Sequence, residues 1–315
     1  MTKNNSTIRS IAFALAIFFV FLPTFSFALV NEEGVDKFRK SVNSILSNTC
    51  LRKNNYGVKI YSLDRGETLY EIRSKRLFIP ASNAKVLTTA VALKYLGSNY
   101  RFSTEFYTDG ILENETLKGN LYIKGSGDPK LVTEQLWLIV NELRNLPIKK
   151  IKGNIIADDS FFDNQKRIKT WIKNPGAQAY EAPLGALSFN FNTVKVYVSP
   201  GEKVGDRPGI VIEPENEYIK LENNAQTLRP GKRRRLIVNR VDKEDHDLIT
   251  VSGGINIGQP RAHYFLNITN PTQYALSVFK SYIDLSGITF DGQLQRGKVP
   301  DDAMELYIHE GEPLA

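Results

Sequence analysis

Residues 78–90, with the sequence FIPASNAKVLTTA, decide how the rest of this chain is interpreted. They open an apolar run, residues 82–96, which predicts a buried helix that ends at Gly97. Ser82 and Lys85 are three residues apart, so in a helix their side chains lie one turn apart on one face. The helix N-terminus favours a developing alkoxide and, together with burial, disfavours the charged form of lysine. A neutral Lys85 can take the proton of Ser82, which can then attack a carbonyl group.

The Ser-x-x-Lys pattern alone is a weak signal, because four-residue patterns arise by chance. The alternative is an N-capping Ser82 followed by a solvated Lys85. The preceding residues favour the nucleophile: residues 58–63 alternate with period two, Gly66 lies in a turn, and residues 68–72 return as a second strand. A β-hairpin, a Pro-Ala pair and an apolar helix around the serine therefore predict a nucleophile and its base.

The pattern of the sequence changes after Gly97. Short strand-like runs alternate with Gly- and Pro-containing turns, and they predict a β-rich domain. The runs are residues 100–108, 116–124, 151–157, 193–198, 209–213, 235–241 and 248–257. Helical periodicity predicts three further helices, at residues 32–48, 131–143 and 270–285.

Several ordered landmarks resemble the penicillin-binding protein 4 type of D-alanyl-D-alanine carboxypeptidase/endopeptidase, peptidase family S13. They are residues 57–63, 78–90, 125–129 (GSGDP), 158–163 (DDSFFD), 182–192 (APLGALSFNFN) and 287–288. The resemblance implies an α+β fold, in which a β-lactamase/transpeptidase-like domain carries a large β-rich insertion after the nucleophile helix. It divides the chain into residues 29–96 of the transpeptidase-like domain, an insertion at 97–290 and a return segment at 291–315.

The same resemblance implies roles for three residues. Ser82 is the acylated nucleophile and Lys85 its general base. Asp158 resembles an aspartate of the insertion that faces the ammonium group of the substrate's diaminopimelate side chain, a pairing that suits a carboxylate; a capped turn at Asp158 and Asp159 is the alternative. The implied substrates are peptidoglycan stem peptides, with β-lactam antibiotics as inhibitors and no cofactor.

The sequence also departs from the family. Members need a Ser-x-Asn and a Lys-Thr/Ser-Gly motif after the insertion, and this sequence contains neither Lys-Thr-Gly nor Lys-Ser-Gly. Ser188-Phe189-Asn190 fits Ser-x-Asn literally, but it lies among the insertion's strands, where the family has a Ser-Leu-Asn-like run unrelated to catalysis. Residues 308–315 resemble the segment just before the family's Ser-Asp-Asn helix, which predicts a C-terminally truncated chain.

Three functions follow from these observations. The first is a serine carboxypeptidase or endopeptidase that works through an acyl-Ser82 intermediate. The second is a catalytically inactive fragment that retains a cell-wall-associated β domain, since losing oxyanion stabilisation alone costs roughly 10²–10³ in rate. The third is a subunit completed by a second polypeptide.

The first 28 residues predict a signal peptide. Lys3 and Arg9 precede an apolar run at residues 11–22, and Ser26-Phe27-Ala28 is a small-x-small cleavage site. A retained N-terminal anchor is the alternative. The prediction is an exported protein of the periplasm or cell surface, with cleavage near Ala28.

The net charge of +7 suits anionic surfaces. It predicts residence beside cell-wall polymers or a peripheral contact with anionic lipids, whereas export argues against nucleic acid. The basic run at residues 232–235 is either a solvated loop or a polyanion contact. His246, His263 and His309 lack metal-ligand spacing, and the single cysteine, Cys50, excludes an internal disulfide, so no metal site is predicted.

Overall fold

The computed structural model describes residues 32–47, 55–168, 176–232 and 235–315. The chain divides into two compact units, Met1–Lys85 and Val86–Ala315. The predicted signal peptide and Cys50 lie outside the described residues. Among the helices that the structure describes, none has the length and apolar content needed to cross a membrane.

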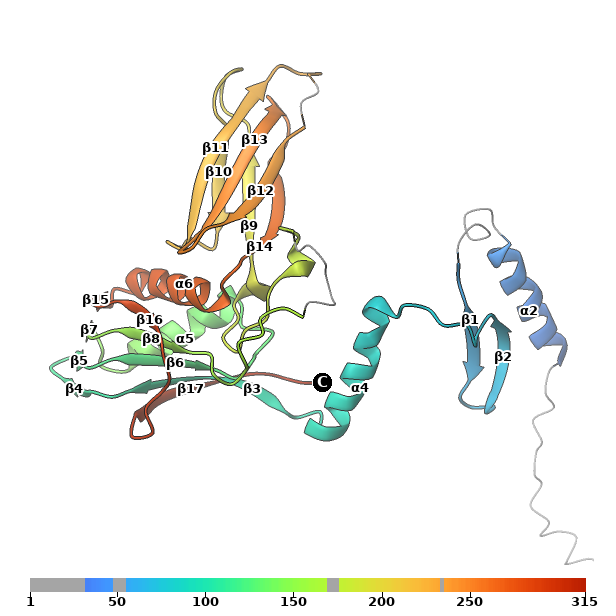
Figure 1. Cartoon of the computed structure of the whole chain (residues 1–315), viewed down its shortest axis with the longest axis horizontal. Helices are drawn as coiled ribbons and strands as arrows, with labels where there is room; N and C mark the ends of the chain where they lie inside the picture. The colour runs from blue at the N-terminus through green and yellow to red at the C-terminus, as the bar shows by residue number, and fades with distance from the viewer. Residues whose placement is uncertain (1–31, 48–54, 169–175, 233–234) are drawn as a thin grey trace, which may run out of the picture. The chain divides into compact units, whose positions relative to one another are not determined.

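The first unit contains a helix and the predicted β-hairpin (Figure 1). Its elements are α2 (Glu32–Leu46), β1 (Val58–Ser62), β2 (Glu67–Ile72) and the 3₁₀ turn η1 (Ala81–Asn83). Strands β1 and β2 pair antiparallel around a turn in which Gly66 has a φ of 65°. The Tyr70 hydroxyl donates to Asn43 Oδ1 at 2.7 Å, and Arg39 Nε donates to the Leu69 carbonyl at 2.8 Å, so α2 is held against β2.

Helix α4 (Ala84–Leu96) begins directly after η1. Its prediction as a buried helix is wrong for this structure, because none of its residues is buried. Val86 and Leu87, at its start, are 74% and 71% exposed. The sequence is apolar on every side of the helix, a pattern that indicates burial, but the described residues supply no layer that covers it.

The second unit is built on a bent sheet that has a five-stranded part and a four-stranded part. Five strands form one part, in the order β16 (Leu294–Arg296), β8 (Ile155–Asp158), β6 (Leu121–Gly125), β3 (Arg101–Thr108) and β17 (Met304–Pro313). Four strands form the other part, in the order β15 (Thr289–Phe290), β7 (Lys150–Lys152), β5 (Thr116–Lys118) and β4 (Ile111–Glu113). Each strand of the second part is followed or preceded in the chain by its counterpart in the first, so the two parts are a single layer bent at one line.

Glycines occupy that line because the backbones touch there. A Cβ at Gly153 would lie 2.1 Å from the Gly119 carbonyl oxygen, and one at Gly292 would lie 1.7 Å from the Gly153 carbonyl oxygen. Beside them, Asn120 Oδ1 accepts the Asn154 N–H at 2.8 Å, and Asn154 Oδ1 accepts the Gln293 N–H at 3.0 Å. Close backbone approach and this ladder of side-chain amides fix the corner.

Two helices, α5 (Thr133–Asn145) and α6 (Pro271–Leu285), cover the sheet and contribute to its core (Figure 1). Phe106 of β3 stacks on Phe279 of α6 with ring centroids 5.7 Å apart. The side chain of Asn270 caps α6 by accepting the Gln273 N–H, and Gly287 follows the helix with a φ of 84°. The predicted helices at 131–143 and 270–285 are therefore confirmed within two residues.

A β-sandwich occupies the sequence between η3 (Asn190–Asn192) and α6 (Figure 1). One sheet has the order β10 (Gly209–Glu213), β9 (Thr193–Ser199), β14 (Ala262–Asn267), and the other has the order β11 (Ile219–Leu228), β13 (Asp247–Asn256), β12 (Ile237–Asp242). Alternate residues of β9, namely Val194, Val196 and Val198, are buried. The buried valines meet Ile249 and Val251 of β13 in the hydrophobic core.

The predicted α+β, β-rich architecture is confirmed. All seven predicted strand runs contain strands, although two of the runs break at Gly119 and Gly153. Six strands were not predicted: β4, β11, β14, β15, β16 and β17. Strand β17 pairs antiparallel with β3, so the end of the described chain returns to the sheet's first strand.

Candidate active site

The predicted nucleophile and base lie within contact of each other. Ser82 is the middle residue of η1, and Lys85 is the second residue of α4. The Lys85 Nζ donates to the Ser82 Oγ at 3.3 Å. A nucleophile and its base are expected within hydrogen-bond reach, with looser distances in the absence of substrate. The structure thus brings the two predicted residues within hydrogen-bond reach at the start of α4.

The backbone in front of the serine is strained. Ala81 has a φ of 45°, a left-handed conformation that an alanine rarely adopts. Pro80 sets the turn, because its carbonyl oxygen accepts the Asn83 N–H at 2.9 Å. Strain of this kind accumulates at functional positions, where the surrounding structure must hold the chain in place.

The environment of the pair differs from the expectation in one respect. The Ser82–Lys85 hydrogen bond is exposed. Burial was expected to favour the neutral form of Lys85, but the described residues leave its side chain exposed.

Asp158 belongs to the second unit, at the end of β8, and is 3% exposed. Its Oδ1 accepts the Ser160 N–H and its Oδ2 accepts the Val299 N–H, each at 2.9 Å. Burial raises the pKa of Asp158, but the hydrogen bonds from Ser160 and Val299 outweigh burial and leave the pKa below its usual value. Its contacts in this structure are those of a capped turn, and its predicted pairing with an ammonium group stays a prediction.

The side chain of Asp159 contacts different residues from those that contact Asp158. Its carboxylate pairs with Arg296 Nε at 2.7 Å and with Lys166 Nζ at 3.8 Å, and it accepts a hydrogen bond from Thr272 of α6. Asp159 is 6% exposed, so this is a nearly buried carboxylate with two cations. The two adjacent aspartates thus join β8 to two different segments, the return segment at Val299 and the helix α6.

Ser188 and Asn190 make structural contacts, as the interpretation of their motif expected. The Ser188 hydroxyl donates to the Gly185 carbonyl at 2.8 Å. Asn190 Oδ1 accepts the Thr133 N–H at 3.1 Å, which ties η3 to the start of α5. Both side chains are used in local structure of the second unit.

A buried polar group in the second unit was missed by the sequence analysis. Among the described residues, Thr104 Oγ1, Asp128 Oδ2 and His309 Nε2 are buried without a hydrogen-bond partner. Thr104 and His309 face each other across β3 and β17. Burial lowers the pKa of His309, and the negative charge of Asp128 opposes this effect. The strand β17 was not predicted, so no local pattern indicated that His309 would lie near Asp128 of the GSGDP turn.

A serine followed three residues later by a lysine is one of the motifs of β-lactamases and penicillin-binding proteins. The sequence agrees over residues 38–315 with the D-Ala-D-Ala carboxypeptidase 3 (S13) family. The chain therefore belongs to this family, and the resemblance found in its motifs is confirmed.

Two curated relatives have similar sequences. The D-alanyl-D-alanine carboxypeptidase of Actinomadura sp. (strain R39) is 26% identical over 289 residues, which are 89% of this chain and 53% of the relative. The D-alanyl-D-alanine carboxypeptidase DacB of Haemophilus influenzae is 23% identical over 268 residues, which are 83% of this chain and 54% of the relative. The chain thus spans about half the length of these relatives.

The fold is similar to a solved structure, penicillin binding protein 4 (dacB) from Haemophilus influenzae. The TM-score is 0.69 at 23% sequence identity, and the match covers 82% of this chain and 57% of the other. This likeness confirms the predicted fold class.

Proposed function

We propose that this protein acts as a serine-type D-alanyl-D-alanine carboxypeptidase on peptidoglycan stem peptides, with Ser82 as nucleophile and Lys85 as general base. The observation that carries the proposal is the 3.3 Å contact between Lys85 Nζ and Ser82 Oγ at the start of α4. Membership in the S13 family supports it.

The reaction follows from this geometry. Neutral Lys85 takes the proton of Ser82 as the serine oxygen forms a bond to the carbonyl carbon of the penultimate D-alanine. The peptide bond breaks, and the terminal D-alanine leaves with the proton that Lys85 returns to its amine. Water then attacks the acyl-serine ester, which releases the shortened stem peptide and restores the Ser82 hydroxyl. An interpeptide bond in place of the terminal one would make the same chemistry an endopeptidase reaction.

β-Lactam antibiotics are the second proposed class of ligand. The serine would open the lactam ring and retain it as an ester. A Haemophilus influenzae penicillin binding protein 4 structure, solved in complex with a β-lactam, has the same fold at 22% identity and a TM-score of 0.64. That likeness supports the fold, and the Ser82–Lys85 pair supports the chemistry.

The location and the finer binding contacts belong to the same proposal. Export to the periplasm or cell surface, with cleavage near Ala28, fits a substrate in the cell wall. The positive net charge of +7 supports a peripheral contact with anionic membrane lipids. Asp158, whose two oxygens each accept one backbone N–H and keep a further lone pair, is the proposed contact for an ammonium group of the substrate.

Covalent labelling with a penicillin tests the nucleophile. The purified chain is incubated with benzylpenicillin and its intact mass is measured beside Ser82→Ala and Ser188→Ala. We expect one adduct on the wild type and on Ser188→Ala, and none on Ser82→Ala. An adduct that persists on Ser82→Ala, or its absence from folded wild type, would contradict the proposal.

A further inference from the structure

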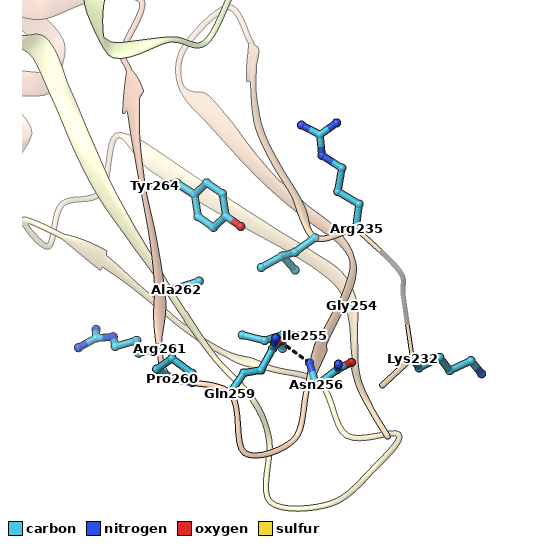
Figure 2. Close-up of a pocket in the computed structure, with 11 residues that line it drawn as sticks. Lys232, Arg235, Gly254, Ile255, Asn256, Gln259, Pro260, Arg261, Ala262 and Tyr264 are labelled. Atoms are coloured by element: carbon cyan, nitrogen blue, oxygen red, sulfur yellow. Dashed lines mark hydrogen bonds between the residues drawn. The ribbon is translucent and has the colours of Figure 1, made fainter. Parts of the chain in front are cut away.

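The β-sandwich has a pocket of about 630 Å³ at the end where β13 turns into β14 (Figure 2). Three of the residues around it are basic, but Figure 2 shows the side chains of Lys232, Arg235 and Arg261 directed away from it. These cations therefore do not form a common binding surface. A different feature, the strained backbone at Ala81, bears directly on the candidate active site.

The backbone turns from a right-handed to a left-handed conformation at the residue before the proposed nucleophile. Pro80 has a φ of −66° and a ψ of −25°, and Ala84 has a φ of −57° and a ψ of −26°, so both are right-handed. Ala81, between them, has a φ of 45°. Among residues 74–96, all of which the structure describes, no other residue has a positive φ. The direction of the chain at Ser82 therefore depends on one left-handed residue.

The side chain of Ala81 takes no part in a hydrophobic core, because the residue is exposed. Backbone hydrogen bonds hold the turn instead: the Pro80 carbonyl accepts the Asn83 N–H at 2.9 Å, and the Ala81 carbonyl accepts the Ala84 N–H. A substitution at position 81 therefore acts mainly through the backbone conformation that the new residue prefers. Left-handed backbone suits glycine and asparagine, and it is a rare exception for β-branched residues.

The loop that leads to Ala81 is anchored on the residues that precede the hairpin. A Cβ at Gly57 would lie 2.9 Å from Phe78 Cε2 and 2.9 Å from the Arg73 carbonyl oxygen, so both groups lie directly against Gly57. Arg73 itself has a φ of 51°, and its guanidinium carbon lies 5.3 Å from the centre of the Tyr56 ring. Strained conformations persist where the surrounding contacts over-determine them, and these contacts hold both ends of the loop.

The left-handed turn decides whether Ser82 meets Lys85. Lys85 is part of α4, whereas Ser82 lies in the short turn η1 that Ala81 begins. The Lys85 Nζ lies 3.3 Å from the Ser82 Oγ, at the long end of the range for a hydrogen bond. A misplacement of about 1 Å costs roughly 10²-fold in rate, so a small change in this turn has a large effect on the reaction.

We propose that Ala81 is a positioning residue for the reaction at Ser82. Its left-handed backbone sets the Ser82 oxygen within reach of Lys85. The inference rests on the proposed function and deepens it, because the pair must be in contact for Lys85 to take the proton. Position 81 accordingly accepts residues that adopt left-handed backbone and excludes β-branched ones.

Acylation of Ala81 variants by benzylpenicillin tests the proposal. Asparagine and valine are similar in size, but asparagine adopts left-handed backbone far more readily. We expect Ala81→Val to lower the maximal acylation rate by roughly tenfold or more, and Ala81→Asn and Ala81→Gly to keep it within about threefold. The benzylpenicillin concentration that gives half the maximal rate should change by less than about twofold, because the loss lies in the Ser82–Lys85 contact and not in binding.

Two controls separate backbone conformation from general damage. Ala90→Val makes the same change at an exposed position inside α4, and it should alter the rate by less than about twofold. Phe78→Ala removes the ring that lies on Gly57, whereas Leu77→Ala changes a neighbour that is 95% exposed. We expect Phe78→Ala to slow acylation by roughly threefold or more and Leu77→Ala by less than about twofold. Circular dichroism establishes that each variant is folded.

A thiol in place of the serine reports the same geometry without catalysis. Ser82→Cys is made together with Cys50→Ala, which removes the single natural cysteine, and the pH dependence of alkylation by iodoacetamide gives the thiol pKa. A thiol next to a lysine has a lowered pKa. Both Ala81→Val and Lys85→Gln should raise the pKa of the introduced thiol by about one pH unit, and Ala81→Asn should leave it unchanged.

The proposal is overturned if Ala81→Val is acylated and titrates as the wild type does, or if Ala81→Asn or Ala90→Val loses as much as Ala81→Val. Equal rates for Phe78→Ala and Leu77→Ala would contradict the anchoring on which it depends. Wild type that takes up no benzylpenicillin, with a thiol pKa that still depends on residue 81, would overturn the proposed catalysis and leave the positioning role standing. Labelling of the wild type with no dependence on residue 81 would overturn the positioning role alone.

Discussion

The two units of this chain are stabilised by different kinds of contact. The second unit encloses a continuous hydrophobic core that draws on both parts of the bent sheet, on α5 and α6 and on the sandwich. The first unit, which holds Ser82 and Lys85, has Tyr70 as its one buried hydrophobic residue among those described. Its order depends on local geometry: a hairpin, a proline turn and a few hydrogen bonds to α2. The Ser82–Lys85 pair is thus placed by short-range structure, while most of the buried hydrophobic residues lie in the second unit.

The largest expected effect comes from a matched pair of leucine substitutions, one in the buried core and one in the exposed helix α4. Leu117 in β5 is 0% exposed, whereas Leu87 in α4 is 71% exposed. Leu117→Ala should lower the free energy of unfolding by about 2–5 kcal/mol, because it removes buried methyl groups and leaves a cavity. Leu87→Ala should change it by less than about 0.5 kcal/mol.

Urea unfolding followed by circular dichroism measures both variants. A loss at Leu87 as large as that at Leu117 would show that α4 is packed as tightly as the core. The contrast between the exposed helix α4 and the buried core of the second unit would then be wrong.

The glycine corner of the bent sheet gives the next largest effect. A Cβ at Gly153 would lie 2.1 Å from the Gly119 carbonyl oxygen, so Gly153→Ala should destabilise the second unit by about 1–3 kcal/mol through a forced backbone shift. Gly209→Ala is the control, since nothing lies within 4 Å of its Cβ position. Thermal unfolding of the two variants should separate them, and equal melting temperatures would refute a tightly packed corner.

Two ion pairs, one in each unit, should give smaller losses of stability. Asp159→Asn removes the carboxylate that pairs with Arg296 and Lys166, and we expect a loss of about 1–2 kcal/mol. The loss falls below that of a fully buried pair because the Arg296 side chain is 49% exposed and can be hydrated. Asp36→Asn breaks the exposed pair with Arg39 in the first unit and should cost about 0–0.5 kcal/mol. Urea midpoints report both losses, and a larger effect at Asp36 would contradict the assignment.

The smallest expected effect is a pH dependence due to His309. Burial lowers its pKa in the folded state, with Asp128 opposing, so the unfolded state binds the proton more readily. Stability is therefore retained above the unfolded pKa, about 6.5, and falls as the pH drops below it. His309→Gln should flatten the slope of unfolding free energy between about pH 7 and 5. An identical slope in the variant, measured by urea titration at each pH, would exclude His309 as the cause.

Much of this architecture could be predicted from the sequence. The hairpin, the α5 and α6 helices and most strands follow from periodicity and from turn glycines, which depend on neighbouring residues alone. The Ser82–Lys85 contact was predictable for the same reason, because a spacing of three residues at the start of a helix places the two side chains one turn apart. Burial of α4 was not, because burial depends on what covers a helix and not on its own sequence.

The remaining features depend on contacts between distant residues. The bent sheet arises where Gly119, Gly153 and Gly292 meet, and the repeated Lys-Gly-Asn at residues 118–120 and 152–154 is the signal that could have revealed it. The unpaired His309 arises because β17 returns to β3, which no local pattern indicates. Two of the three partners of Asp159, Thr272 and Arg296, come from segments more than a hundred residues away in sequence.

The central claim is that the exposed Ser82–Lys85 pair carries acyl transfer, and release of D-alanine tests it most directly. The purified chain is incubated with a peptide that ends in D-Ala-D-Ala, and free D-alanine is measured for the wild type, Ser82→Ala and Lys85→Ala. The account predicts release by the wild type and a loss to background in both variants, with circular dichroism showing all three folded. Folded wild type that releases no D-alanine, or release that survives in Ser82→Ala, would contradict it.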